Sequence, residues 1–478
     1  MTEIELKFQV PERRQAAVLR AVATGSAQTT RLKAQYFDSA DRRLARNAIA
    51  LRLRQENGRW VQTLKAPGAA GIQRLEHEVV LGAGPPRIEL SRHAGTAVGK
   101  LLLDALDDAP LLEIFATDVV RTHRLVRSGA TQIEIACDVG ELLAAGGARQ
   151  AICELELEWK SGPLSGLFSL AQRWAKGHGL WLDVRSKSER GELLARGAAA
   201  SPASKASCPA LRKEMGRDAA LRAIVATCLK QLLPNLSALA AETGDASHLH
   251  QARIGLRRLR TALKVFKTWS PALDPGWEPT LGALFTQLGS QRDQDALGAA
   301  LLPALMAAGA PLATLADLPS ATSIGPTLRA PVQVQTWLAL LAFALDTGGE
   351  ESPAGVALKK SAATVLADQH RRVNKAARHF EAMDDEARHQ LRKRLKRLRY
   401  STELLASLFA AKKVKKQLEI LRPAQEALGH YNDLCVAEAL FRHLAETDPR
   451  AWFAVGWLVA QRDAQVAVAA ATLRDARD

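Results

Sequence analysis

Cysteine is scarce in this sequence, and its few copies lie far apart. The five cysteines, at positions 137, 153, 208, 228 and 435, form no CxxC pair, and no histidine lies near them at zinc-finger spacing. These absences exclude a disulfide framework and a sulfur-ligated metal, and they favour a reducing compartment such as the cytoplasm. Any metal ion would therefore be bound by oxygen ligands.

Long apolar runs are also lacking. The most apolar stretch, VQTWLALLAFAL at 334–345, is too short to span a bilayer. The N-terminus lacks the basic run and apolar core that are typical of a signal peptide. No Ser-His-Asp or Cys-His arrangement that would support covalent catalysis stands out. We therefore expect a cytoplasmic protein without a membrane partner.

Acidic residues are too few to balance the basic ones. There are 65 Lys and Arg against 50 Asp and Glu, a formal charge of +15. Residues 201–478 carry 37 Lys and Arg against 27 Asp and Glu, so they hold +10 of this excess. Such an excess indicates a polyanionic partner: nucleic acid, an anionic membrane or a phosphate polymer.

The 478 residues are too many for one ordinary core, so several domains are expected. Alternating apolar residues predict strands at 2–9, 49–55, 59–65, 73–81, 131–138 and 152–159. The segment GAAASPASKASCPAL, at 197–211, has the small and polar composition of a linker. From about residue 215 an apolar period near 3.6 predicts a helical bundle.

The helical half repeats itself. HQARIGLRRLR at 250–260 aligns without a gap with HQLRKRLKRLR at 389–399, and LGSQRD at 288–293 matches LGHYND at 428–433. Two matches at nearly one offset indicate two copies of a unit of several helices, packed as pseudo-symmetric halves.

Charged residues recur at every second position of the predicted strands. The opening MTEIELKF places Glu3, Glu5 and Lys7 on one strand face and three apolar residues on the other. The same alternation groups Arg52 with Arg54, Thr63 with Lys65, Arg74 with Glu76 and Glu78, Glu134 with Asp138, and Glu154 with Glu156 and Glu158. A solvated face with cross-strand ion pairs is the plain alternative.

Clustered acids favour a binding site over a solvated face. Neighbouring carboxylates repel each other unless a cation lies between them, and a hard divalent ion suits carboxylate and water ligands. The bases are mostly arginines, whose planar guanidinium groups match phosphate oxygens. If the sheet closes with its charged faces inward, its lumen would bind a polyanion together with its metal.

These motifs as a set resemble the CYTH, or triphosphate tunnel metalloenzyme, family. The resemblance covers residues 1–192 and runs through EIELK, YFDS at 36–39, LRLR at 51–54, the Lys65 strand, RLEHE, TDVVR, IEIACDVGEL, CELELEW and RSKSERG at 185–191. It implies an eight-stranded antiparallel tunnel that hydrolyses or transforms triphosphate compounds with Mg²⁺ or Mn²⁺.

The resemblance also implies roles for individual residues. The expected triphosphate ligands are Lys7, Arg52, Arg54, Lys65, Arg121 and Lys187, and Glu76 is expected to support the arginines. Arg124 is an alternative to Arg121. The expected metal ligands, direct or through water, are Glu3, Glu5, Asp138, Glu154 and Glu156.

Basic residues form a stripe on one helix of each repeat. At 3.6 residues per turn, two groups share a face: His250, Arg253, Arg257, Arg260, Lys264 and Lys267, and then His389, Arg392, Lys396 and Arg399. A solvated face would explain one such stripe. Like charges at these spacings destabilise a helix, so their presence in both copies indicates an anion ligand.

The HxxRxxxRRLR pattern and the LGxxxD element resemble the CHAD domain, over roughly 216–478. This resemblance implies that the basic surface binds inorganic polyphosphate, with contacts from both stripes. In the second copy Lys396 replaces Arg257, which keeps the charge but loses the guanidinium fork.

The expected fold is α+β: an eight-stranded antiparallel β tunnel barrel with flanking helices, then an all-α pseudo-two-fold helical bundle. The expected domains are 1–196 and 216–478, joined by a linker at 197–215, with repeats at about 216–330 and 355–478.

The favoured function is a cytoplasmic triphosphatase that acts on inorganic triphosphate and associates with polyphosphate granules. The alternatives are a nucleoside or thiamine triphosphatase, an adenylyl cyclase, or a non-catalytic scaffold for polyphosphate or nucleic acid. Nucleic acid is the less favoured partner, because no motif with base-reading aromatic residues stands out.

Overall fold

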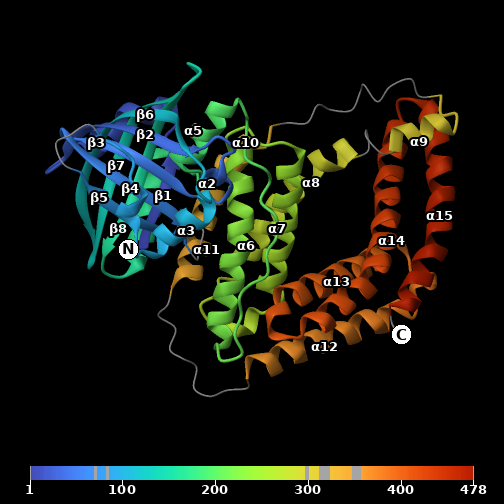
Figure 1. Cartoon of the computed structure of the whole chain (residues 1–478). Coiled ribbons are helices and arrows are strands. Elements are labelled where there is room, and N and C mark those ends of the chain that lie inside the picture. Colours follow the sequence, from blue (N-terminus) through green and yellow to red (C-terminus); the bar gives the residue numbers. More distant parts are fainter. Residues whose placement is uncertain are drawn as a thin grey trace. The chain divides into compact units, whose positions relative to one another are not determined.

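The computed structural model describes residues 2–68, 73–81, 86–296, 301–311, 323–346 and 357–476, with the side chains of 2, 290–296 and 302 left out. Its first part contains the strands β1 (Thr2–Gln9), β2 (Gln28–Ser39), β3 (Ala50–Glu56), β4 (Arg59–Pro67), β5 (Gln73–Val80), β6 (Leu111–Ser128), β7 (Thr131–Ala144), β8 (Arg149–Ser161) and β9 (Trp181–Leu182). The helices α1 (Gln15–Val22), α2 (Arg43–Arg46), α3 (Ala97–Leu106), α4 (Leu164–His178) and α5 (Lys187–Arg196) lie between and after these strands (Figure 1).

The strands form a closed antiparallel barrel. Their order is β5-β4-β3-β2-β6-β7-β8-β1, and β1 returns to β5, with Glu3 opposite Arg74. The short strand β9 pairs with the end of β1, beyond the residues that pair with β5. The barrel confirms the expected fold class, in which a β tunnel precedes a helical region.

Two strands, β2 and β6, were not visible as charged alternations. On β2 the buried residues Leu32, Ala34 and Tyr36 line the barrel interior, whereas the residues between them face outward and are mostly exposed. The lumen face of β2 is therefore mostly apolar, whereas β3 beside it supplies Arg52 and Arg54.

Helices cover the apolar outer face of the barrel. Val98, Leu102 and Leu106 of α3 pack with Leu51 of β3 and Leu64 of β4 in one buried cluster. The helix α5 instead closes one end, where Leu194 and Ala195 pack against a cluster that includes Tyr36, Phe115 and Leu142. The charged residues thus lie inside a sheet whose outer face is apolar, and α5 closes one end.

The remaining residues are helical. Their elements are α6 (Arg217–Ala240), α7 (Ala246–Val265), α8 (Trp277–Ala296), α9 (Leu302–Ala307), α10 (Gly325–Arg329), α11 (Pro331–Leu345), α12 (Leu358–Ala377), α13 (Asp385–Leu404), α14 (Ala411–Leu444) and α15 (Trp452–Asp475). The helices α7 and α13 begin and end 139 residues apart, at the offset of the sequence repeat. Each of these helices buries an apolar stripe, which includes Leu256 on α7 and Leu395 on α13.

The chain packs as two compact units that do not follow sequence order. One contains residues 1–205, 229–252 and 323–346, and the other contains 206–228, 253–322 and 347–478. In the first unit α11 packs on α4, and Gln335 donates to the carbonyl of Gln172 at 3.0 Å. This grouping follows packing, so the expected domain limits at 196 and 216 stay a prediction.

Among the described residues α6 is the one helix that is long and apolar enough to cross a membrane. Of its most apolar 18-residue window, 72% is buried inside the protein.

Candidate active site

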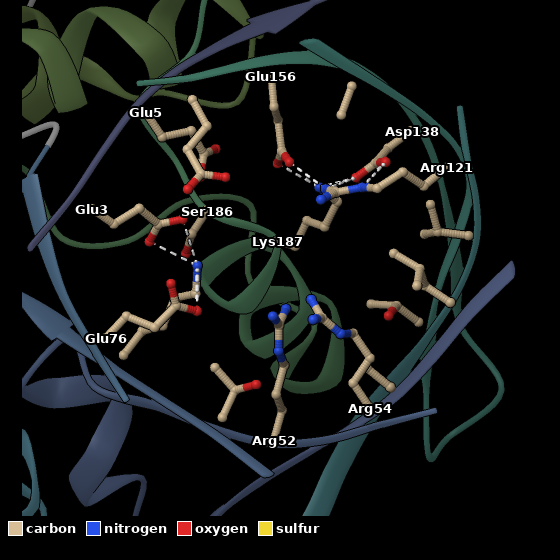
Figure 2. Close-up of a pocket in the computed structure, with 18 of the residues that line it drawn as sticks. Glu3, Glu5, Arg52, Arg54, Glu76, Arg121, Asp138, Glu156, Ser186 and Lys187 are labelled. Carbon is tan, nitrogen blue, oxygen red and sulfur yellow. Dashed lines mark hydrogen bonds and ion pairs between the residues drawn. The ribbon is translucent and has the colours of Figure 1, made fainter. Parts of the chain in front are cut away.

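The barrel encloses a cavity of about 280 Å³ with a charged lining (Figure 2). Its basic residues are Lys7, Arg52, Arg54, Lys65, Arg74, Arg121, Lys160 and Lys187. Its acidic residues are Glu3, Glu5, Glu56, Glu76, Glu78, Glu134, Asp138, Glu156 and Glu158. The alternating strands place these side chains inward because their apolar neighbours pack under the covering helices.

One acidic cluster lies on β7 and β8 around a lysine. Ligand oxygens of Asp138, Glu154 and Glu156 lie within 4.8 Å of one another. The Nζ of Lys187, from α5, is 2.7 Å from Asp138 and 2.7 Å from Glu156, and it also contacts Glu154. Arg121 binds Asp138 through two hydrogen bonds of 2.7 Å and contacts Glu156. An ammonium group thus occupies the centre of a carboxylate cluster.

These pairings keep the cluster ionised. Burial alone would raise the pKa of Asp138 and Glu156, but Arg121 and Lys187 outweigh it and lower both. Burial alone would likewise lower the pKa of Lys187, but the three carboxylates raise it well above its usual value. Three carboxylates with a central cation fit the donor set of a hard divalent ion, which could replace the ammonium group.

A second set of acids comes from β1 and β5. Lys65 on β4 donates to both oxygens of Glu3, at 2.9 and 2.8 Å, and lies 3.0 Å from Glu76. Burial would raise the pKa of Glu3, but Lys65 lowers it, whereas burial raises the pKa of Glu76. One lysine therefore compensates only one of the two carboxyl groups fully.

Glu5 is poorly compensated. Its ion pair with Lys7 has a separation of 3.7 Å. Burial, together with the charge of Glu156, raises the pKa of Glu5 to about 7. A cation between Glu5 and Glu156 would relieve this repulsion, so these donors also fit a divalent ion.

Two arginines on β3 form the opposite, basic side of the lumen. Arg52 donates to the hydroxyl of Tyr36 at 3.3 Å and lies 3.9 Å from Glu78. Arg54 lies 3.5 Å from Glu78 and 3.2 Å from Glu56. Figure 2 shows Arg52 and Arg54 across the cavity from Glu5 and Glu156. Arg52 and Arg54 thus lie across the lumen from the cluster of Asp138 and Glu156, and each side contains both acidic and basic groups.

The helix α5 brings more than Lys187 to the closed end. Ser186 caps this helix by accepting from the amide of Glu189 at 3.0 Å, and both Ser186 and Ser188 line the cavity. Arg190, three residues after Lys187, contacts the buried carboxylate of Glu154. The N-terminus of the helix faces the lumen and so adds positive potential there.

All but one of the residues expected in the tunnel line the cavity. The exception is Glu154, which is fully buried behind the lining between Lys187 and Arg190. Arg121 lines the lumen, whereas Arg124 donates to the carbonyls of Val22 and Ala21. The individual roles of these residues stay predictions.

Tyr36 and Arg190 were missed as lining and supporting residues. Tyr36 lies two residues from Ala34 on the inward face of β2, a spacing that the sequence contained. Arg190 follows Lys187 by three residues, which places both on one helix face. The sequence did not reveal that α5 closes the barrel end, where it packs near Tyr36 and brings Arg190 to Glu154.

The basic stripe of the second repeat is held by the LGHYND element. His389 donates from Nδ1 to the side-chain oxygen of Asn432 at 2.7 Å, and Arg392 donates to the same oxygen at 3.1 Å. Arg399 pairs with Glu403 at 2.7 Å and donates to Gln425 at 2.9 Å. Lys396 is partly buried on the same helix.

In the first repeat the stripe of α7 packs against α8. Arg253 is buried, Arg257 is partly buried, and both lie under 5 Å from the centre of the Phe285 ring. His250 and Lys264 are exposed. The side chains of residues 290–293, which end the LGSQRD element, lie outside the described residues.

Known proteins resemble both halves of the chain. Residues 1–191 match the family model of the CYTH domain, and residues 223–442 match that of the CHAD domain. An inorganic triphosphatase of Haemophilus influenzae is 33% identical over 163 residues, which cover 33% of this chain and 44% of that protein. The chain thus spans less than half the length of this relative.

Two further relatives extend the comparison. An uncharacterised protein of Mycobacterium tuberculosis is 28% identical over 480 residues, which cover 91% of this chain and 87% of that protein. The solved CHAD domain of the plant Ricinus communis is 31% identical, with a TM-score of 0.48, over 56% of this chain and 96% of that one.

Proposed function

Because residues 1–191 match the CYTH domain model and residues 223–442 match the CHAD domain model, we propose that the protein is a metal-dependent triphosphatase. Its proposed reaction is the hydrolysis of inorganic triphosphate to pyrophosphate and phosphate. The name of the Haemophilus influenzae relative supports this reaction. The observation that carries the proposal is a closed lumen in which clustered carboxylates face guanidinium and ammonium groups.

The basic residues would hold the phosphate chain. Arg52 and Arg54 lie on one side, and Arg121 and Lys187 lie beside the acidic cluster. Lys187, Arg121 and Lys65 are paired with lumen carboxylates, so a triphosphate and its cation would exchange partners with them. This exchange conserves charge balance, which a lumen of this kind requires.

The acidic residues would hold the cation. We propose Mg²⁺ or Mn²⁺ bound by Asp138, Glu154 and Glu156, with Glu3 and Glu5 contributing directly or through water. A bound divalent ion would neutralise phosphate oxygens and supply an activated water for attack on the terminal phosphorus.

The protein's own contribution is positioning and electrostatic stabilisation. Lys7, Lys65 and the lumen arginines would stabilise the charge that develops on the departing pyrophosphate. Glu76 is expected from the sequence to support the arginines, and this role stays a prediction. Because Glu76 also lies 3.0 Å from Lys65, it would orient that lysine rather than contact the substrate. The apolar packing of α5 would exclude bulk water from the closed end.

Inorganic triphosphate suits this cavity better than a nucleotide. Among the described lining residues the aromatic rings are those of Tyr36 and His123, and the Tyr36 ring already stacks on Phe115 with centroids 4.4 Å apart. A nucleobase would therefore find little free aromatic surface to stack on inside the tunnel.

We further propose that the basic helices bind inorganic polyphosphate and so bring the enzyme to its phosphate polymer in the cytoplasm, on polyphosphate granules. The positive excess of the second half and the duplicated stripes support this role. The expected residues are those of the two stripes, from His250 to Lys264 and from His389 to Arg399.

A phosphate-release assay tests the catalytic proposal. The purified full-length protein is given inorganic triphosphate, ATP or thiamine triphosphate, each with Mg²⁺ or Mn²⁺ and with or without EDTA. We expect inorganic triphosphate to give the highest kcat/KM and EDTA to abolish release. Faster turnover of ATP or thiamine triphosphate would support the alternative substrates, and activity in EDTA would contradict the metal assignment.

A further inference from the structure

The helix α8 places one carboxylate among the basic residues of α7. Arg260 donates from Nε to Oε1 of Glu278 at 2.9 Å, and its Nη2 lies 2.8 Å from the same oxygen. Lys264, one turn later on α7, lies 3.0 Å from this oxygen. A single carboxylate oxygen of Glu278 therefore forms ion pairs with two residues of the stripe.

The second repeat adds positive charge to the same place. Arg397 of α13 is partly buried within electrostatic range of Glu278 and Arg260, and also of Arg394 and Arg372. Burial, followed by the charge of Arg394, lowers the pKa of Arg397, and Glu278 only partly offsets these effects. Arg260 and Lys264 of α7 thus pair directly with Glu278, and Arg397 of α13 lies within electrostatic range of the same acid.

Three arginines of the α7 stripe are held in place by one aromatic ring of α8. The guanidinium carbons of Arg253, Arg257 and Arg260 lie 4.8, 4.9 and 5.6 Å from the centre of the Phe285 ring. Cation–π contacts on one ring hold three long side chains in a row along α7. A ligand that binds there loses less affinity to the ordering of side chains.

We propose that Glu278 occupies, as an internal carboxylate, a phosphate-binding position shared by the two repeats, and that polyphosphate binds there by displacing it. This inference rests on the proposed polyphosphate binding and assigns its regulation. A carboxylate and a phosphate group both accept hydrogen bonds from Arg260 and Lys264, so the two compete for the same donors. Polyphosphate displaces Glu278 when its concentration is high enough, and the presence of Glu278 raises the concentration that is required.

The substitution Glu278→Gln tests the competition, because glutamine keeps the size and the accepting oxygen but loses the charge. We expect Glu278→Gln to bind long-chain sodium polyphosphate about tenfold more tightly than the wild type at low ionic strength. Glu446→Gln removes the same charge from an exposed position of the same compact unit and is expected to change the affinity less than about twofold. Arg397→Gln, outside the predicted stripe, is expected to weaken binding by about tenfold.

A shorter acid separates charge from packing. Glu278→Asp keeps the negative charge, so it should bind polyphosphate within about twofold of the wild type. Equal tightening by Glu278→Asp and Glu278→Gln would assign the effect to loosened packing and overturn the inference. Circular dichroism at the assay temperature establishes that each variant is folded.

The outcomes distinguish this inference from the proposed function. If the wild type binds polyphosphate and folded Glu278→Gln binds no more tightly, the internal competitor is refuted and polyphosphate binding stands. If neither protein binds polyphosphate, both are refuted, while triphosphate hydrolysis is judged by its own assay.

Discussion

Glu5 is the lumen carboxyl whose charge the fold compensates least. Burial, together with the charge of Glu156, raises its pKa to about 7, and Lys7 at 3.7 Å offsets this only in part. A protein gains nothing in stability from such a group, because burial of a weakly paired charge is costly. The position therefore makes sense as part of a site for a cation and its phosphate ligand.

The substitution Glu5→Gln is expected to lower kcat for inorganic triphosphate by about 100-fold or more, because a cation ligand is lost. In EDTA the variant should melt at the same temperature as the wild type or higher, since the uncompensated charge is gone. Phosphate release and circular dichroism measure the two effects. Wild-type turnover by Glu5→Gln, and also by Glu154→Gln, would remove the metal assignment.

His93 illustrates a titrating residue that serves the fold. The amide oxygen of Gln62 accepts from Arg92 at 2.9 Å and from the backbone of Glu89 at 3.1 Å, so its NH₂ group faces His93 Nε2 at 2.9 Å. His93 must therefore accept there and donate from Nδ1 to His77 at 2.9 Å. Only the neutral ring can do both.

Burial, with the neighbouring His77 and Arg92, lowers the pKa of His93 to about 4. The unfolded chain binds this proton near pH 6.5, so its contribution to stability is complete above that pH and is lost as the pH falls toward 4. We expect the free energy of unfolding to lose up to about 3 kcal/mol more between pH 7 and pH 4 in the wild type than in His93→Gln. Urea unfolding at both pH values measures this difference, and equal losses would contradict it.

The helix α5 is the element on which the lumen depends most. It presents Lys187 to the acidic cluster, and one turn later Gly191 lies against the ring of Phe115. A Cβ on Gly191 would lie 2.1 Å from that ring, which is well inside van der Waals contact. The glycine is thus required for a close approach of helix and strand.

The substitution Gly191→Ala is expected to shift α5 outward, lower stability by about 1–3 kcal/mol and reduce kcat/KM, because Lys187 moves with the helix. Gly177→Ala on α4 is the matched control, since its Cβ would meet no atom within 4 Å. That variant should be neutral or slightly more stable. Unchanged activity and melting temperature in Gly191→Ala would show that α5 tolerates displacement.

On the scale of the whole molecule, the two halves carry different kinds of charge. In the barrel, bases and acids pair inside a lumen, whereas the helical half holds most of the net positive excess. The first arrangement suits a small anion together with its cation, and the second suits a long polyanion.

We expect duplex DNA not to displace long-chain polyphosphate from the full-length protein at equal phosphate concentration. Polyphosphate is flexible and can follow closely packed basic side chains, whereas a duplex presents fixed phosphates on a wide surface. A competition assay with labelled polyphosphate measures this preference, and binding of both should weaken with salt. Displacement by DNA would favour the nucleic-acid scaffold.

Much of this protein was determined by its sequence. Period-two charge placed Glu3, Glu5, Arg52 and Lys65 on lumen faces, and the 139-residue offset located α7 and α13. Local periodicity is a property of neighbouring residues, so it is readable without a fold. The strand β2 escaped this reasoning because its inward face is apolar.

Tertiary structure decided which charged residues become neighbours. It placed Lys187 among three carboxylates of β7 and β8, buried Glu154 behind the lining, and brought Arg397 of one repeat near Glu278 of the other. Charged residues that lie far apart in the sequence pair with one another, and shift one another's pKa values, only in the folded chain. Their signs were visible in the sequence, but their neighbours were set by the closure of the barrel and the packing of helices.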